Sequence, residues 1–438
     1  MKRLFAILLV MSLAFGQMET AKKLKDAKES YLDAGVGYAN IDGESYFMMN
    51  ITPDLSFGKF GAGLNLELMF GGEDGFKFRK DAYENGAGWL RIIRYLRWGH
   101  KGDEVHLRVG TIDNGTLGNG FLMFHYTNEG DYDNRKIGAV IDLDFNDFGI
   151  ETIYSNFGRP EIFGARAYYR PLVNMNMPVI STLEVGGTYL TDSYADPNGK
   201  TPSTIDNGDK LSMFGFDIGM YLAKTDMLKW KLYYDFGKIS DYGSGSAIGT
   251  SFNFGAMDAI NFHAKYERRI LGDEFMPSVF GPLYELHKST GSIKAALANM
   301  KGLSGNFFEV GTSLLNTFHF TGNWQKLDDP ENMPKDATNE TGTFYGELSV
   351  DADLPFEIAG RYVKTGIESI SDLPGFNENS LAEVELGYQI NTYLFLTTTY
   401  RWNWVEKDVL DGNGDKTGNT TFESQRRIIP KLSFRYNF

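Results

Sequence analysis

Hydrophobicity in this 438-residue chain alternates with a period of two residues in one short segment after another. In 137–145 the odd positions are apolar, and 228–236 and 260–267 alternate in the same way. A strand with this pattern places one face in apolar surroundings and the other in water. After the N-terminal dozen residues, no uninterrupted apolar run approaches the roughly 18–20 residues that a membrane-spanning helix needs. The pattern therefore predicts an all-β protein.

The composition agrees with many short strands and turns, because the chain has 50 glycines and 14% aromatic residues. It has no cysteine, which excludes disulfide scaffolds, cysteine–zinc sites, thiol catalysis and a lipid-modified N-terminal cysteine. The formal charge of −14 disfavours a nucleic-acid partner.

The N-terminus has the three parts of an export signal. Lys2 and Arg3 form a positive region, 4–15 an apolar core, and 14–16 a small-x-small cleavage site. We therefore expect a cleaved signal peptide over 1–16, a short charged periplasmic lead-in over 17–30, and one barrel domain over 31–438.

The connections between the alternating segments differ sharply in length. The tight ones, rich in Asn and Asp, are 146–147, 224–226, 316–317, 353–355 and 391–392. The long polar ones are 71–88, 191–209, 271–304, 327–342 and 406–421. If the last strand descends to the periplasm, every tight turn falls on the periplasmic side and every long loop outside. Short turns at one end and long loops at the other are expected of an outer-membrane barrel, whereas a soluble sandwich has no reason to sort them.

The C-terminal strand alternates as well. Leu432, Phe434, Tyr436 and Phe438 are aromatic or apolar, and the chain stops at Phe438. Here the sequence resembles the bacterial outer-membrane β-barrel proteins, whose last strand characteristically ends in phenylalanine. The resemblance covers the general pattern of about 31–438. It implies that the barrel assembly machinery recognises 428–438, and that the protein sits in the lipid of the bacterial outer membrane.

Counting hairpins backward from the C-terminus predicts about 20 strands, with 16–20 as the range because 31–51 and 104–135 are ambiguous. The predicted fold is a transmembrane antiparallel up-and-down β-barrel of 16–20 strands. Barrels of this size leave an aqueous lumen, which favours a channel.

The tight turn at 146–147 also predicts register. It pairs Phe145 with Phe148, and therefore Asp142 with Glu151, which would lie opposite Arg166 on the lumen side. This charged patch either tunes which ions pass or is an ordinary solvated wall. The pore-lining candidates are Asp142, Asp144, Glu151, Arg166, Arg170, Lys229, Lys231, Asp235, Lys265, Glu267, Glu357, Arg361, Glu383, Glu385, Lys431 and Arg435.

Two segments depart from simple alternation. In 89–98, Arg91 and Arg97 fall on one face and Arg94 on the other, and a bulge could shift the phase. Leu394 and Leu396 would face the lumen if Phe395 faced lipid.

Two loops are candidates for narrowing the lumen. The first, 113–135, has an apolar centre over 121–126, so it should fold inward or form another strand. The second, 271–304, contains a predicted short helix over 292–300. A plain surface loop is the favoured interpretation for it, with a constricting loop as the alternative.

A metal site is conceivable at Asp411, Asn413 and Asp415, whose alternating oxygen ligands resemble the first half of an EF-hand-type calcium loop. The glycine position of that loop is Lys416 and the twelfth position is Phe422. These departures favour a solvated extracellular turn. We expect no other cofactor.

No catalytic motif is found, and the six histidines are scattered. The sequence thus predicts a non-enzymatic, porin-like channel for passive diffusion of ions and small hydrophilic solutes. The alternative is a loop-plugged barrel for surface binding, adhesion or structure. A substrate-specific channel is a third possibility, and a homotrimer would be common for this class.

Overall fold

The computed structural model describes residues 30–437 except 42–43, 73–74, 81–82, 84–88, 130–135, 176, 196–209, 257–259, 290–291, 316, 330–340, 351–354, 378 and 411–415. The predicted signal peptide, most of the 17–30 lead-in, the three calcium candidates and Phe438 lie outside the described residues. The turns at 316–317 and 353–355 are described only in part.

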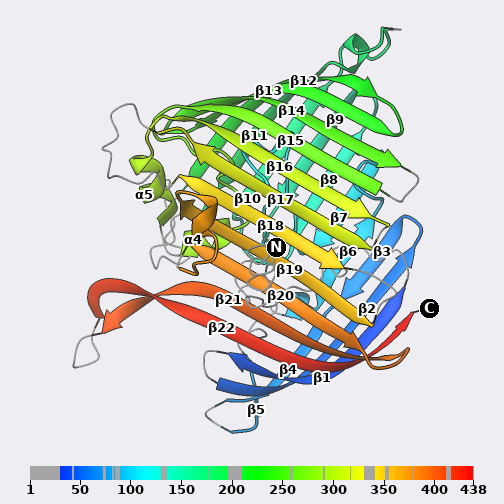
Figure 1. Cartoon of the computed structure of the whole chain (residues 1–438), viewed down its shortest axis with the longest axis vertical. Coiled ribbons are helices and arrows are strands. Elements are labelled where there is room, and N and C mark those ends of the chain that lie inside the picture. Colours follow the sequence, from blue (N-terminus) through cyan, green and yellow to red (C-terminus); the bar gives the residue numbers. More distant parts are fainter. Residues whose placement is uncertain are drawn as a thin grey trace.

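The alternating segments form one antiparallel sheet that closes on itself (Figure 1). Its first half comprises β1 (Tyr31–Ile41), β2 (Glu44–Phe57), β3 (Phe60–Leu64), β4 (Leu66–Gly71), β5 (Lys77–Phe78), β6 (Ile93–Trp98), β7 (Val105–Gly110), β8 (Gly138–Asp144), β9 (Phe148–Tyr154), β10 (Ile162–Tyr169) and β11 (Glu184–Asp192). Its second half comprises β12 (Leu211–Lys224), β13 (Leu228–Ile239), β14 (Ser244–Ala256), β15 (Ile260–Leu271), β16 (Ser304–Leu314), β17 (Phe318–Leu327), β18 (Gly342–Val350), β19 (Phe356–Ile367), β20 (Ser380–Gln389), β21 (Leu394–Leu410) and β22 (Lys416–Asn437).

The first and last strands close the barrel, because β1 pairs antiparallel with β22 from Tyr31↔Asn437 upward. β3 and β4 both pair with β2 and together make one wall strand interrupted at Asn65, while β5 is a short addition to β4. The described residues thus form a closed barrel of 20 strands. The predicted fold class is confirmed, and the strand number lies at the upper end of the predicted range.

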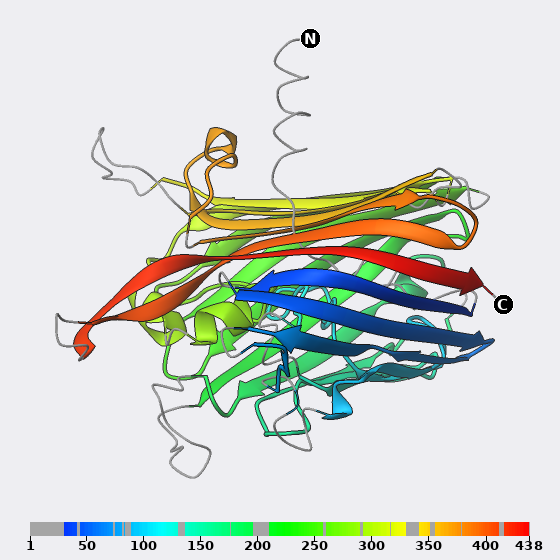
Figure 2. The ribbon, with the colours of Figure 1, turned by 90° about the horizontal axis from the view of Figure 1, so that it is seen from below.

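The helices lie at one end of this barrel (Figure 1). They are α4 (Tyr284–Ser289) and α5 (Ser292–Asn299); of two short 3-10 turns, η5 (Ile370–Asp372) lies at the same end between β19 and β20, and η2 (Ile180–Thr182) precedes β11. The β21–β22 hairpin extends beyond its neighbours at the same end, and the C-terminus lies at the opposite end (Figure 2). We call these the extracellular and periplasmic ends, following the sequence assignment. Among the described residues, no helix is both long and apolar enough to cross a bilayer.

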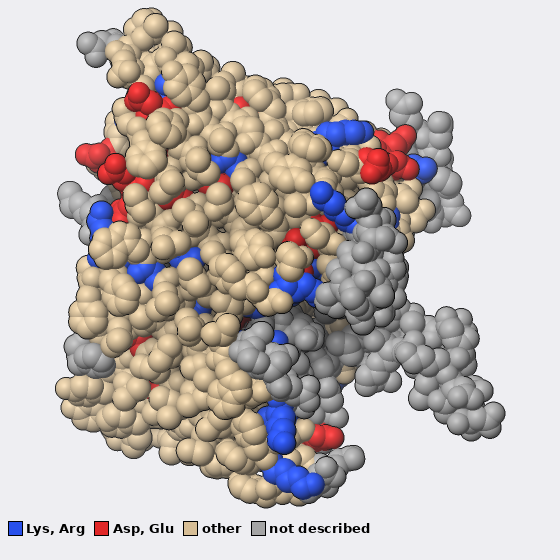
Figure 3. Space-filling view, turned by 180° about the vertical axis from the view of Figure 1, so that it is seen from behind, with Lys and Arg blue, Asp and Glu red and all other residues tan. Residues whose placement is uncertain are grey.

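The outer face of the wall is apolar. On β13, Trp230, Leu232, Tyr234 and Phe236 are exposed, whereas the intervening Asp235 is buried inside. On β22, Leu432, Phe434 and Tyr436 are likewise exposed, while Lys431 and Ser433 are buried. In the space-filling view, uncharged residues cover most of one side of the barrel (Figure 3). A closed wall with this outer surface is suited to lipid, because every wall strand has a hydrogen-bonded neighbour on both sides.

The two irregular segments are resolved by the structure. At β6 the pairing with β3 shifts between Gly63 and Leu64, so Arg94 has no partner of its own in the ladder. This bulge turns Arg94 inward, where it contacts Asp54, so Arg94 and Arg97 face the same side; of the interpretations left open by the sequence, the shift of phase by a bulge is the one observed. At β21, Phe395 is buried inside and Leu396 is exposed outside, so Leu396 does not face the lumen.

Candidate functional site

The interior of the barrel contains a loop that leaves the wall early. β7 ends at Gly110 and β8 begins at Gly138, and we call residues 111–128 inward loop 1. The loop closes on itself, because Gly115 and Tyr126 exchange backbone hydrogen bonds of 2.8 and 3.0 Å. The Ile112 N–H also donates to Asn128 Oδ1 at 2.9 Å. The prediction that this apolar segment folds inward is confirmed.

The loop carries its apolar side chains against the inner wall. Leu117, Phe121, Leu122 and Met123 belong to a buried cluster that extends over β9 to β17. Burying such side chains stabilises the docked loop by about 1.5–3 kcal/mol each. The full cluster of buried residues is Ile112, Leu117, Phe121, Leu122, Met123, Tyr126, Ile153, Ile162, Leu190, Ala195, Leu211, Met213, Ile239, Ala247, Leu271, Phe275, Val279, Phe280, Tyr284, Ile293, Leu297 and Leu327.

Glycines in the wall make room for this loop. A Cβ at Gly215 would lie 2.7 Å from Leu122 Cδ1, and one at Gly237 would lie 2.5 Å from Leu122 Cδ2. A Cβ at Gly245 would lie 2.6 Å from Phe275 Cδ1. Real Cβ atoms essentially never approach other atoms this closely, so a larger residue at any of these positions would force the loop side chain or the wall to shift. We call Gly215, Gly237 and Gly245 the glycine seat.

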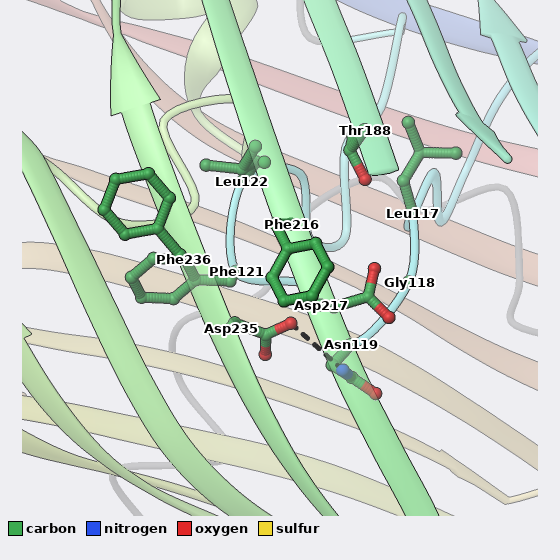
Figure 4. Close-up of a pocket in the computed structure, with 11 residues that line it drawn as sticks. Leu117, Gly118, Asn119, Phe121, Leu122, Thr188, Phe216, Asp217, Asp235 and Phe236 are labelled. Atoms are coloured by element: carbon green, nitrogen blue, oxygen red, sulfur yellow. Dashed lines mark hydrogen bonds between the residues drawn. The ribbon is translucent and has the colours of Figure 1, made fainter. Parts of the chain in front are cut away.

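The polar tip of inward loop 1 is held by charged wall residues (Figure 4). Asn119 Nδ2 donates to Asp235 Oδ1 at 3.0 Å, and Lys231 Nζ donates to Asn119 Oδ1 at 3.0 Å. Lys265 Nζ donates to the Asn119 carbonyl oxygen, and the Gly118 N–H donates to Glu151 Oε2 at 2.8 Å. Four of the predicted pore-lining residues therefore bind the loop instead of facing open water.

The second long loop also folds inward. We call residues 272–303 inward loop 2; it contains α4 and α5, and Met123 forms a parallel bridge with Phe280. Phe275 and Phe280 are buried in the same apolar cluster as inward loop 1. The predicted helix over 292–300 is observed as α5, but the favoured surface-loop interpretation is wrong. The loop folds inward because it supplies large apolar side chains that pack in the same cluster as those of inward loop 1.

A buried charge cluster ties α4 to the wall. Lys288 Nζ lies 2.7 Å from both Glu161 Oε2 and Asp192 Oδ2, while Lys136 contacts Glu161 and Glu285. Burial alone would raise the pKa of Glu161, but Lys136 and Lys288 hold it well below its usual value. Burial alone would lower the pKa of Lys288, but the surrounding carboxylates raise it above its usual value. We call residues 136, 161, 192, 285 and 288 the α4 lock.

The predicted register at β8 to β10 is confirmed. Asp142 pairs with Glu151, and Glu151 pairs with Arg166. Arg166, which is 2% exposed, donates twice to Asp217 at 2.7 and 2.8 Å and once to Glu184 at 2.8 Å. The charged patch is therefore an enclosed ion-pair network next to the tip of inward loop 1.

The same network includes further pore-lining candidates. Arg170 bonds both oxygens of Asp144 at 2.6 and 3.0 Å and also reaches Glu184 at 2.9 Å. Asp142 lies 3.1 Å from His106 Nδ1. Glu267 accepts from Tyr233 at 2.8 Å and contacts Lys265 at the same distance.

The opposite side of the barrel has a polar inner face built from β19 to β22 and β1 to β3. Asp33 contacts Lys431 at 2.9 Å and Arg435 at 3.3 Å, and Arg435 bonds Glu357 at 2.6 Å. Nearby, Glu383 lies 3.3 Å from Arg401 and 3.9 Å from Arg361. We call this region the polar wall; it carries both signs of charge in alternation.

Two of the predicted pore-lining residues remain. Glu385 is buried on the polar wall and accepts a weak contact from Thr399 at 3.5 Å. Lys229 is exposed near the periplasmic turn and forms no ion pair with another described residue. Within the part of the chain that the structure describes, no group of three or more His, Asp or Glu side chains is arranged to hold a metal ion.

Sequence reasoning missed several partners of these residues. Asp33, Glu184, Asp217 and Glu309 all face inward, and alternation alone could have identified Asp217 between the outward Phe216 and Ile218. The α4 lock could not be found this way, because Glu285 and Lys288 come from inward loop 2, which no hairpin register connects to Glu161 and Asp192.

Comparisons with known proteins add little. No protein-family model matches the sequence, and a search of curated proteins finds no match. Among solved structures, OccK10 (OpdN) of Pseudomonas aeruginosa is 13% identical, with 94% of this chain and 99% of that chain covered and a TM-score of 0.33. OpdK of the same organism, solved with vanillate, is 12% identical, with 94% and 98% covered and a TM-score of 0.33.

Wzi of Escherichia coli, titled as a carbohydrate-binding β-barrel involved in capsule assembly, is 11% identical, with 95% and 86% covered and a TM-score of 0.38. Identities and TM-scores this low support no inference about how the present chain works. The class follows from the chain's own structure instead: a closed 20-strand wall with an apolar exterior and a charged interior is an outer-membrane β-barrel of the bacterial envelope.

Proposed function

We propose that this barrel is a narrow passive channel for small hydrophilic solutes, and that solutes pass along the polar wall beside the two inward loops. The observation that carries this proposal is the asymmetry of the interior. The inward loops pack an apolar cluster against β9 to β17, whereas the inner face of the polar wall is lined by ion-paired side chains such as Asp33, Glu383 and Arg435. Charged side chains in a barrel interior are stable when water reaches them.

The charge pattern of the polar wall supports a class of solute. Positive and negative groups alternate along a row of ion pairs that runs from Lys431 through Asp33 and Arg435 to Glu357. A wall of one sign would favour one sign of ion strongly. The alternating wall instead favours solutes that are neutral or carry both charges, with weak preference between simple ions.

The test is single-channel conductance of the refolded protein in a planar bilayer, with a salt gradient to obtain the reversal potential. A gel shift between unheated and boiled samples first establishes that the barrel has folded. We expect small, stable open steps and a reversal potential near zero. Liposome swelling with sugars of increasing size then measures the cut-off. A folded barrel that never conducts and never admits the smallest sugar would contradict the proposal.

The second candidate is a loop-plugged barrel that binds a partner at the cell surface. The glycine seat favours it, because a wall shaped around Leu122 and Phe275 indicates that the inward loops stay docked. The same recordings separate the two functions, since a plugged barrel gives no steps until the loops are removed. A variant with Leu122→Asp and Phe275→Asp would then conduct while the natural protein does not.

The assembly steps are proposals too. Signal peptidase would cleave after Gly16, which N-terminal sequencing of the mature protein tests. Recognition by the barrel assembly machinery through 428–438 predicts that deletion of Phe438 slows insertion into the outer membrane. Cross-linking in native membranes would show whether the barrel is a trimer.

A further inference from the structure

Five side chains form a continuous polar chain from inward loop 1 to the wall. His125 Nδ1 lies 2.7 Å from Asn114 Oδ1, and His125 Nε2 lies 2.9 Å from Glu309 Oε2. On the other side of the carboxylate, His263 Nε2 lies 3.0 Å from Glu309 Oε1, and His263 Nδ1 lies 2.8 Å from Asn253 Oδ1. We call these five residues the histidine latch.

The latch holds a part of the loop that is under backbone strain. His125 has a φ of 53°, in the left-handed region that residues other than glycine seldom adopt. Its ring stacks on Tyr345 of β18, with centroids 4.8 Å apart and planes at 4°. Such a conformation persists only when surrounding contacts over-determine it. The contacts to β16 and β18 therefore fix how far inward loop 1 reaches across the lumen.

The number of N–H donors on the two histidine rings depends on their protonation, so the number of hydrogen bonds in the latch depends on pH. A carboxylate only accepts, and the Asn114 and Asn253 atoms in contact are amide oxygens, so all four ring nitrogens face acceptors. A neutral imidazole has one N–H and an imidazolium has two. The four contacts are all satisfied when both histidines are protonated. When they are neutral, each ring keeps one of its two bonds unless the neighbouring amide turns over.

The charges around the latch come from several strands. Glu309 lies between the two rings, and its cross-strand partner is Lys265. The Lys265 Nζ lies 4.5 Å from the centre of the Phe124 ring. The Tyr345 hydroxyl donates to Glu347 at 2.6 Å, and Glu347 lies 3.8 Å from Arg361. Asp113 is engaged by Arg108 at 3.2 Å. Glu309 is thus the carboxylate in direct contact with both rings.

We propose that His125, His263 and Glu309 are positioning residues that draw inward loop 1 towards β16 in acid and thereby set the width of the passage. The inference rests on the proposed channel, since the width matters only if solutes pass. Histidine is the side chain whose charge ordinarily changes between about pH 5 and 8. The docked loop is therefore tightest at the acid end of that range.

The first test is independent of conduction. Hydrogen exchange of the 113–126 backbone, corrected for intrinsic rates, is compared at about pH 5.5 and about pH 8 in the folded barrel, on either side of the histidine range. Because charge-assisted hydrogen bonds are the stronger ones, we expect about tenfold more protection in acid. Glu309→Gln, which keeps the shape, removes the difference, and His263→Gln, which leaves the loop sequence intact, reduces it. His100→Gln, at an exposed histidine outside the latch, retains it.

Equal protection at both pH values, or an undiminished pH effect in Glu309→Gln, would overturn the latch. Conductance is then recorded over the same pH range. A conductance that changes with pH for the natural protein and for His100→Gln, but not for Glu309→Gln, supports the link to pore width. If the conductance does not change with pH while the hydrogen-exchange protection of inward loop 1 does, only the link to pore width is overturned. A barrel with a working latch that never conducts overturns the proposed channel instead.

Discussion

The two sides of the barrel interior use inward-facing positions in opposite ways. Against β9 to β17, glycines at 215, 237 and 245 replace side chains, so that the wall receives Leu122 and Phe275 of the inward loops. On the polar wall, the corresponding positions carry Asp33, Lys431 and Arg435. The first side is a packed protein core, whereas the second is a charged surface.

This difference teaches which side of the interior is filled by apolar packing and which side is lined by paired charges. An apolar cluster excludes water because its side chains gain by leaving water. Paired charges lose part of their hydration when buried and regain it in a wet lumen. We therefore expect substitutions in the packed side to change stability and loop docking, and substitutions in the polar wall to change ion preference.

The largest expected effect is at the α4 lock. Lys288→Met leaves Glu161 and Asp192 buried next to each other with less positive charge, which costs about 3–5 kcal/mol of folding free energy when a buried pair is broken. Denaturant unfolding of the refolded barrel measures the loss. Lys229→Met, at an exposed position, serves as control and should change stability by less than about 0.5 kcal/mol. Equal stability of the two variants would show that α4 is held by apolar packing alone.

The next effect is at the glycine seat. Gly237→Ala places a Cβ 2.5 Å from Leu122 Cδ2 and 3.0 Å from Phe275 Cζ, so we expect overpacking to cost about 1–3 kcal/mol and to loosen inward loop 1. The matched control is Gly187→Ala, where a Cβ meets nothing within 4 Å. Thermal unfolding compares the two. If Gly237→Ala is as stable as Gly187→Ala, the loop is not seated as the structure places it.

A smaller effect on stability, but a clear one on selectivity, is expected on the polar wall. Arg435→Met removes a positive partner of both Glu357 and Asp33, and lost charge-assisted bonds cost about 1.5 kcal/mol. The passage becomes more negative, so the reversal potential in a salt gradient should move towards cations. Arg166→Met, inside the enclosed network, is the contrasting variant. A larger shift for Arg166→Met than for Arg435→Met would place the passage on the other side.

The last prediction is that the stability contributed by the α4 lock does not change with pH between acid and strongly basic conditions. A carboxylate with a lowered pKa, such as Glu161, contributes stability above its unfolded value of about 4.3 and loses it only as the pH falls through the lower folded value. A lysine with a raised pKa, such as Lys288, contributes fully below its unfolded value of about 10.4 and loses this as the pH rises through the folded value.

The α4 lock should therefore be constant between about pH 5 and 10, in contrast to the histidine latch. Hydrogen exchange of 279–289 across this range measures it, with 113–126 in the same sample as the responsive comparison. A parallel pH response of both segments would mean that the two inward loops move as one unit.

Much of the wall could be predicted from the sequence. Period-two alternation predicted the outward faces of β13 and β22, and the tight turn at 146–147 predicted the pairing of Asp142 with Glu151 and of Glu151 with Arg166. These predictions succeeded because a strand has two faces and a short turn allows few registers. They failed at β6, where a bulge added one residue and turned Arg94 inward.

The sequence by itself determined the closed barrel, its apolar exterior and the inward position of most charged residues, because each depends on local alternation and on short turns. Only the tertiary structure decided what those charges contact. The α4 lock joins residues 136, 161, 192, 285 and 288, and the histidine latch joins 114, 125, 253, 263 and 309. Such groups meet because long loops fold back into the lumen, and the path of a long loop is set by the whole surface it buries.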